Sequence, residues 1–288
     1  MKKKFFNGLQ LFEGRSLVIA TMHHKDKVMA PILEKELQVS CSLVSGLNTD
    51  IFGTFSGEIE RKKSPLETVR SKALAALDKC SETLVVASEG SFGPHPSSMF
   101  LPANEEIVIL IDIKHNIEII GKHFTLDTNF RNSSISSLNE LETFLEEIGY
   151  PEQGVVIKFS ESNTKSKILK AFSSYEEIKR KVARALLNKI EVMVETDMRA
   201  MMNPTRMKAI EHATLNLIKN IKSLCPRCNA PGFVVKEYIP GLPCEMCHLP
   251  TKKPKAYIFY CDKCEFELKR LEKKILYEEA MFCDFCNP

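Results

Sequence analysis

SPLETVRSKALAALDKCSETLVVASEGSFGPHP, residues 64–96, is the stretch that decides the fold. Ser64, a proline directly after it and Glu67 three residues later predict a helix that begins with a capping box. Apolar residues recur at helical spacing as far as Cys80, which predicts one buried face. LVVAS, residues 84–88, is typical of a strand buried on both faces, and we expect it to end at the acidic, glycine-bearing turn that starts with Glu89.

A helix packed on this strand would bring charged side chains from both elements together. Glu67, Lys72 and Glu89 are therefore the candidate catalytic residues. A glutamate at the third helical position also has a sufficient explanation as a cap, so Glu67 needs no catalytic role.

Upstream, SLVIAT (residues 16–21) predicts a strand, and the spacing of residues 28–37 predicts a helix. The loop between them carries His23, Lys25 and Lys27. A basic loop between the carboxyl end of a strand and a helix start is a common phosphate site. The alternative is a solvated basic turn.

The rest of the first 222 residues predicts an α/β domain. Strands are expected at residues 38–46, 105–112, 116–124 and 154–160, and helices at residues 141–149 and 175–190. Residues 47–63 indicate a hairpin or flap, and residues 125–139 a loop. The strands at 105–112 and 116–124 are expected to be antiparallel, which predicts a mixed central sheet flanked by helices.

A polar segment precedes the last helix of this domain. Asn203-Pro204 indicates the helix start. The charged residues around this helix start are Asp197, Arg199 and Arg206. They could bind a phosphate group or the acidic edge of a nucleotide base. The alternative, which is equally favoured, is that these residues form a cluster of structural salt bridges.

Eight of the ten cysteines fall into four Cys-x-x-Cys pairs near the C-terminus. The pairs are Cys225/Cys228, Cys244/Cys247, Cys261/Cys264 and Cys283/Cys286. Two such turns supply four thiolates to one tetrahedral zinc ion, so four pairs predict two structural Zn²⁺ ions. The surroundings of the first and third pairs resemble the halves of a zinc ribbon, which favours first with third and second with fourth. Sequential pairing is the alternative.

Composition limits the remaining choices. The chain has 288 residues and a net charge of +3, which is too small to indicate a nucleic-acid partner. It contains no apolar run near the ~20 residues of a membrane span, and cysteines in metal-binding spacing suit a reducing compartment, so we expect a cytoplasmic protein without membrane contact. Two domains are expected, at residues 1–222 and 223–288.

The order of motifs resembles that of inosine-triphosphate pyrophosphatase-like proteins. Ala20-Thr21-Met22-His23 stands where that family has Ala-Thr-x-Asn, although His23 replaces the asparagine. Glu67 precedes Lys72-Ala73 at the family's spacing, and Ser88-Glu89-Gly90 stands at its acidic turn. The whole sequence also resembles a bacterial family, without an assigned activity, that joins such a domain to a double zinc-knuckle module.

The resemblance implies a metal-dependent nucleotide phosphohydrolase or a nucleotide-binding protein. Glu67 and Glu89 would hold Mg²⁺, and Lys72 would neutralise phosphate oxygens. The nucleotide-binding residues would be Thr21, His23, Lys25, Lys27, Asp197, Arg199 and Arg206. The alternative is a non-catalytic adaptor whose zinc module binds protein or RNA. The sequence leaves a homodimer open.

Overall fold

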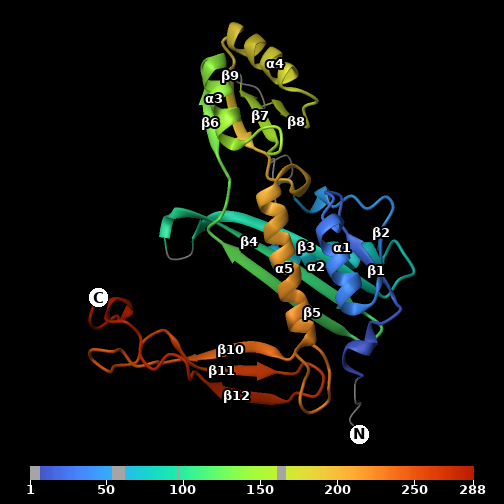
Figure 1. The fold of residues 1–288 in the computed structure, drawn as a ribbon, viewed down its shortest axis with the longest axis vertical. Coiled ribbons are helices and arrows are strands. Elements are labelled where there is room, and N and C mark those ends of the chain that lie inside the picture. Colours follow the sequence, from blue (N-terminus) through green and yellow to red (C-terminus); the bar gives the residue numbers. More distant parts are fainter. Residues whose placement is uncertain (1–6, 54–61, 96–97, 161–166) are drawn as a thin grey trace. The chain divides into compact units, whose positions relative to one another are not determined.

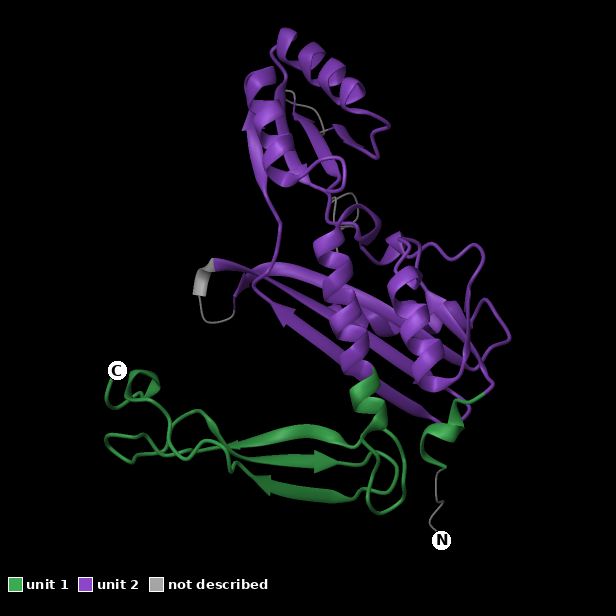
Figure 2. Ribbon diagram, in the orientation of Figure 1, with its two compact units in different colours: residues 1–13, 218–288 green, residues 14–217 purple. Residues whose placement is uncertain are grey.

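The computed structural model describes residues 7–53, 62–95, 98–160 and 167–288. The chain divides into two compact units (Figures 1 and 2). Unit 1 comprises residues 1–13 and 218–288, and unit 2 comprises residues 14–217. None of the described helices combines the length and the apolar character that a membrane crossing requires.

Unit 2 contains a five-stranded sheet with the order β2-β1-β3-β4-β5. Its strands are β1 (Ser16–Ala20), β2 (Ser40–Leu43), β3 (Leu84–His95), β4 (Ser98–Asp112) and β5 (Ile117–Thr125). β1 pairs in parallel with β2 and β3, whereas β3 with β4 and β4 with β5 are antiparallel. This arrangement confirms the mixed α/β sheet predicted from the sequence.

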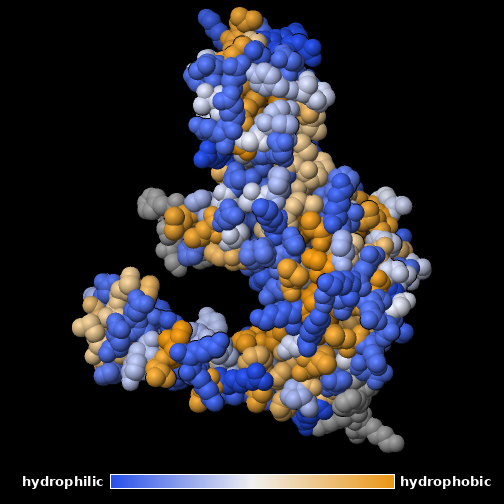
Figure 3. Space-filling model, in the orientation of Figure 1, coloured by the Kyte–Doolittle hydropathy of each residue, from blue (hydrophilic) through white to orange (hydrophobic). Residues whose placement is uncertain are grey.

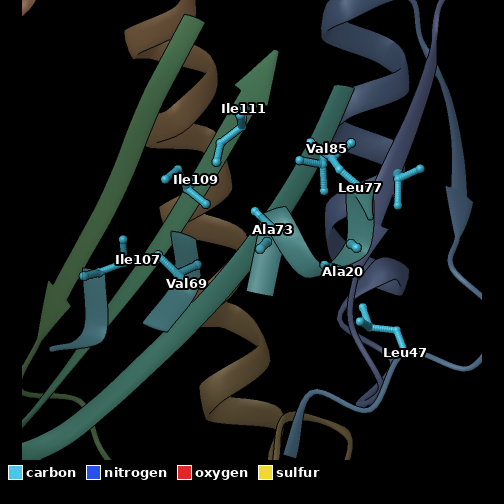
Figure 4. Packing of buried hydrophobic residues seen from close by; sticks show 12 residues of the cluster. Ala20, Leu47, Val69, Ala73, Leu77, Val85, Ile107, Ile109 and Ile111 are labelled. Carbon is cyan, nitrogen blue, oxygen red and sulfur yellow. The ribbon is translucent and has the colours of Figure 1, made fainter. Parts of the chain in front are cut away.

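Two helices cover opposite faces of this sheet. α2 (Pro65–Leu77) begins with the predicted capping box and packs Val69 and Ala73 against Val85 and Ile109 (Figure 4). α5 (Pro204–Lys222) covers the other face: a Cβ atom at Gly121 would lie only 2.5 Å from the Ala213 carbonyl oxygen. Side chains alternate between the two faces of a strand, and Ile120 packs against the α2 cluster.

β3 continues well beyond the expected turn. The prediction that the strand ends at Glu89 is wrong, because residues 89–94 go on pairing with β4 as far as Pro102. A long antiparallel partner supplies hydrogen bonds to a segment whose glycines and proline alone indicated a turn. Glu89 consequently lies inside the sheet and is 1% exposed.

A second sheet in unit 2 has the order β6-β9-β7-β8. Its strands are β6 (Asn132–Ile135), β7 (Val155–Ser160), β8 (Lys167–Lys170) and β9 (Glu191–Thr196), and α3 (Leu138–Ile148) and α4 (Tyr175–Leu187) pack with it. All its neighbouring strands are antiparallel. β6 lies where a loop was expected, since its serine-rich sequence carries no strand signal.

The segments between these elements include the loop that leads from β1 to α1 (Asp26–Leu37) and the short 3₁₀ turn η2 (Asp50–Phe52). Residues 54–61 of the hairpin or flap expected at residues 47–63 lie outside the described residues. A further 3₁₀ turn, η3 (Ala200–Met202), connects β9 to α5.

Unit 1 is built on a three-stranded antiparallel sheet, β10-β11-β12. The strands are β10 (Val234–Pro240), β11 (Pro254–Tyr260) and β12 (Glu267–Leu271), and the 3₁₀ turns η1 (Gly8–Leu11) and η4 (Ala280–Phe282) complete the unit. Phe233, Phe259 and Phe266 form its aromatic contacts.

Candidate anion site and metal centres

The parallel pair β1 and β3 sets the position of a pocket in unit 2. β1 ends at Ala20, which lies opposite Ala87 of β3, and Ser88 follows Ala87. The connection from β1 leads to β2 on one side of it, and the later connection from β2 leads to β3 on its other side. In open α/β sheets, such a point of reversal at the carboxyl end of a strand is where ligands bind.

The pocket encloses about 460 Å³, including the space at its open mouth. Its basic lining residues are Lys25, Lys72, Lys170 and Arg199, and its polar lining includes Thr21, His23, Asp50 and Ser88. The lining therefore holds four cationic side chains against one carboxylate. This imbalance suits an anionic ligand.

Lys25 is the most unusual of these cations. Its side chain is buried, and its ammonium donates one hydrogen bond of 3.2 Å to the Ser88 carbonyl oxygen. Burial, with the nearby positive charges of Arg206 and Lys72, lowers the pKa of Lys25 from 10.5 to about 7. A positive charge at this position is costly, because desolvation and the nearby like charges both oppose it.

His23 contributes a neutral ring. Burial, followed by repulsion from Lys25, Arg206, Arg199 and Lys72, lowers the pKa of His23 to about 3. Its Nε2 lies 3.6 Å from an Asp50 carboxylate oxygen. At neutral pH the imidazole therefore provides hydrogen bonds without adding positive charge.

Two of the pocket cations are held by carboxylates that are not among the lining residues. Lys72 Nζ lies 2.5 Å from Glu89 Oε2, and both side chains are buried. Arg199 Nη2 lies 2.6 Å from Asp197 Oδ2. These pairs orient the two cations and offset part of the cost of burying them.

A third pair lies deeper in the unit. Arg206 Nε donates to Glu106 Oε1 at 2.7 Å, and the exposed fractions of the two side chains are 1% and 0%. Arg206 also donates to the Met198 carbonyl oxygen at 2.6 Å, which ties α5 to the segment before it. A Cβ atom at Gly90 would lie 2.7 Å from Arg206 Nη2, so the pair needs glycine there.

The residues singled out from the sequence divide into three groups. Those lining the pocket are Thr21, His23, Lys25, Lys72 and Arg199. Glu89, Asp197 and Arg206 form ion pairs around it, whereas Lys27 is exposed. Glu67 is exposed and accepts hydrogen bonds from the Ser64 amide and hydroxyl, so Glu67 and Glu89 have different partners and different environments.

Sequence reasoning missed three residues of this region. Ser88 and Glu106 belong to apolar strands, where a single polar residue gives no local signal, and Lys170 ends a short strand. Ser88 is buried, and its hydroxyl has no hydrogen-bond partner among the described residues. A buried polar residue inside a predicted central strand is the one pattern that could have identified Ser88 and Glu106.

Unit 1 contains two groups of four cysteines, each with the geometry of a metal centre. The groups are Cys225, Cys228, Cys261 and Cys264, and Cys244, Cys247, Cys283 and Cys286. The first Cys-x-x-Cys pair therefore lies with the third and the second with the fourth, as the ribbon-like context favoured. Among the described residues, these are the groups of three or more ligands that could hold a metal.

Sulfur spacing supports zinc in both centres. Facing sulfur atoms are 3.6–3.8 Å apart. Four thiolates at ~2.3 Å from one tetrahedral ion stand about 3.8 Å apart, so both tetrads fit a structural Zn²⁺. The Cys225 and Cys244 sulfur atoms also accept backbone amides two residues on, at 3.4 Å. Such bonds stabilise a thiolate ligand.

Three of the four Cys-x-x-Cys turns share one backbone feature. Asn229, His248 and Glu265 each follow the second cysteine of a pair and have φ values of 61°, 57° and 56°. His248 thus occupies a turn position. The centres differ in exposure: three cysteines of the first are buried, whereas Cys286 of the second is exposed.

Fold and site together define an α/β protein with a basic pocket and a separate module carrying two four-cysteine centres. Residues 72–288, about three quarters of the chain, match the DUF6671 family, which is described as a domain of unknown function. The chain belongs to this family. No curated protein matches it.

Proposed function

We propose that unit 2 binds a nucleotide through its phosphate groups, in the pocket at the end of β1. The observation that carries this proposal is the pocket lining, in which Lys25, Lys72 and Arg199 meet from three distant parts of the chain. Cationic side chains with fixed partners recognise phosphate oxygens by charge-assisted hydrogen bonds. The sequence resemblance to inosine-triphosphate pyrophosphatase-like proteins supports a nucleotide over other phosphate compounds.

Hydrolysis of a phosphoanhydride is the further activity that the resemblance implies. It would need a centre that neutralises charge and orients water, and Glu67 with Glu89 was the expected Mg²⁺ pair. Glu67 is engaged in the helix cap and Glu89 in an ion pair with Lys72. The geometry therefore supports binding better than it supports this metal-dependent step.

Nucleotide binding is tested by measuring the melting temperature of the full chain with and without each of a panel of nucleoside mono-, di- and triphosphates. At saturating ligand, we expect a stabilisation of about 2–4 kcal/mol for the preferred nucleotide. Lys72→Met should abolish this shift. Lys35→Met, on the exposed face of α1, is the matched control and should leave it unchanged.

Turnover is measured on the same panel with and without Mg²⁺, comparing the parent with Glu89→Gln. Product formation that Glu89→Gln removes would support a hydrolase. Binding without turnover would show that the protein binds nucleotides but does not hydrolyse them. If no nucleotide of the panel raises the melting temperature, nucleotide binding is refuted.

A second candidate function rests on unit 1. Apolar side chains are exposed around the second four-cysteine centre (Figure 3), and these are Met246, Leu276, Tyr277, Met281, Phe282 and Phe285. Residues 225–288 contain 10 Lys and Arg against 9 Asp and Glu, so the module lacks the basic surface of an RNA-binding domain. Large exposed apolar side chains favour a protein partner.

Site-specific photo-crosslinking in the native host tests the adaptor function. A crosslinker at Phe285 should give one defined protein adduct, and a crosslinker at Tyr238, equally exposed on β10, should not. An adduct with a second copy of the chain would show that this surface forms a homodimer. An RNA adduct at Phe285 would contradict the choice of a protein.

A further inference from the structure

The buried ammonium of Lys25 and the hydroxyl of Ser88 face one small space without filling each other's hydrogen-bonding capacity. An ammonium has three N–H donors, and the described contacts of Lys25 Nζ use one of them, on the Ser88 carbonyl oxygen. Ser88 Oγ is buried and makes no hydrogen bond to any described residue. Buried polar groups are normally paired, so unused donors in a pocket indicate a ligand.

The two cations that lower the pKa of Lys25, Lys72 and Arg206, each pair with a carboxylate. On α2, Lys72 pairs with Glu89 of β3. On α5, Arg206 pairs with Glu106 of β4.

Before η3, Arg199 pairs with Asp197, and the His23 ring is uncharged at neutral pH. No ion pair of Lys25 is found among the described residues, although Asp50 and Lys170 also line its pocket.

We infer that Lys25 and Ser88 form a subsite for a tetrahedral dianion, a phosphate group, that contacts them directly rather than through a divalent metal. This inference rests on the proposed nucleotide binding and specifies which residues of the same pocket contact the phosphate group.

Several physical reasons support direct contact. Glu89 and Asp197 are already neutralised by Lys72 and Arg199, and Asp50 is the one carboxylate among the lining residues, whereas a divalent cation usually takes several oxygen ligands. An added dianion supplies the negative charge that Lys25 lacks, which restores its charged form at neutral pH. The neutral His23 ring can donate or accept without changing the charge balance.

Proton uptake follows from linkage. Burial and the charges of Arg206 and Lys72 lower the pKa of Lys25 to about 7. Above this pKa, binding must first protonate the amine, so affinity should fall about tenfold per pH unit. Below it the ammonium is already present, and affinity should be constant with pH.

Sulfate is the probe for this test, because it is a tetrahedral dianion whose charge stays fixed from about pH 6 to about pH 9. Its affinity for the full chain is measured by calorimetry in a chelator-free buffer without Mg²⁺. Titrations in two buffers of different ionisation enthalpy give the number of protons taken up. We expect close to one proton at about pH 8 and almost none at about pH 6.

Variants separate the subsite from general electrostatics. Lys25→Arg carries a permanent charge, so it should bind sulfate without proton uptake and without the pH slope. Lys25→Met should lose at least tenfold in affinity, and Ser88→Ala several-fold with the slope retained. Lys35→Met, exposed on the same helix, should match the parent.

Sulfate that binds Lys25→Met as tightly as the parent would overturn the inference, as would an absolute need for Mg²⁺. A nucleotide that binds Lys25→Met as tightly as the parent would refute the Lys25 subsite and leave nucleotide binding intact. Failure of sulfate and of every nucleotide to bind would refute both.

Discussion

The cysteine centres and the basic pocket are both clusters of polar side chains, but they have opposite relations to folding. In unit 1, each group of four cysteines has the geometry of a metal centre, and an ion bound there in the folded state would stabilise the fold. In unit 2, Lys25 is buried beside other cations and its charge opposes folding. A cluster that stabilises the fold indicates a structural role, whereas one that costs stability indicates a site kept for a ligand.

Removal of zinc should give the largest effect and separate the two regions most clearly. A strong chelator should abolish the hydrogen-exchange protection of β10–β12, because a small three-stranded sheet has little apolar core of its own. The strands β3–β5 of unit 2 should keep their protection. Metal analysis before chelation should give two zinc ions per chain.

Equal loss of protection in β3–β5 would show that the metal also stabilises unit 2. Protection of β10–β12 that survives complete zinc removal would contradict the structural role of the tetrads. Re-addition of Zn²⁺ is the control for irreversible damage.

Breaking the deepest ion pair should give the next largest effect. Arg206→Met leaves the Glu106 carboxylate buried without its partner, and we expect a loss of about 3–5 kcal/mol in the free energy of unfolding. Arg70→Met is the matched control, because Arg70 and Glu118 are more than one third exposed, and such pairs contribute about 0–1 kcal/mol. Urea unfolding of both variants measures the difference.

Similar losses in the two variants would show that the Arg206 pair is not more important than a surface pair. In the double variant Arg206→Met/Glu106→Leu, most of the loss should be recovered, since no buried charge then remains.

The two regions also differ in how far sequence predicted them. Cysteine spacing predicted the eight candidate ligands, and the sequence around the first and third pairs favoured the pairing that the structure has. This was possible because each Cys-x-x-Cys pair is a local pattern, so only the combination of pairs remained to be decided. The helix cap at Ser64 was likewise a local pattern. The continuation of β3 and the presence of β6 depend on partner strands remote in sequence, so local signals misplaced them.

The pocket was predicted only in part for the same reason. Lys25 and Lys72 stood in recognisable motifs, but the ion pair between Arg206 and Glu106 joins residues 100 positions apart. Ser88 was visible only as a polar residue within a predicted strand, and the sequence alone does not show that it is buried. Burial and pairing, which decide what each charge does, are properties of the tertiary fold.

Burying the charge of Lys25 should lower the free energy of unfolding, so removing this charge should make the protein more stable. Its pKa is lowered from 10.5 in the unfolded chain to about 7 in the folded protein, so the penalty is complete below about pH 7 and disappears as pH rises toward 10.5. We expect Lys25→Met to be more stable than the parent by about 1–3 kcal/mol at pH 7, with the gap closing at alkaline pH. Denaturant unfolding across this pH range measures it.

A destabilised Lys25→Met at neutral pH would show that the ammonium supports the fold and would remove the contrast between the two regions. Saturating sulfate should reverse the order, because the anion stabilises the parent alone.

The helix cap at Ser64 should give the smallest effect and shows what a purely structural polar cluster looks like within unit 2. Ser64→Ala removes the hydroxyl that accepts the Glu67 amide at 3.3 Å, and we expect a loss of about 1 kcal/mol. Glu67→Gln should cost less. Hydrogen bonds from Ser64 lower the pKa of Glu67, so its contribution is present above the unfolded value of 4.5 and is lost as pH falls below it.

Neither cap variant should change sulfate or nucleotide affinity, because both residues lie outside the pocket lining. A Glu67→Gln variant with normal stability but impaired nucleotide turnover would restore Glu67 as a functional carboxylate. With normal binding and a small stability loss, Glu67 is a helix cap only, and the division between stabilising and ligand-binding charges holds within unit 2 as well as between the units.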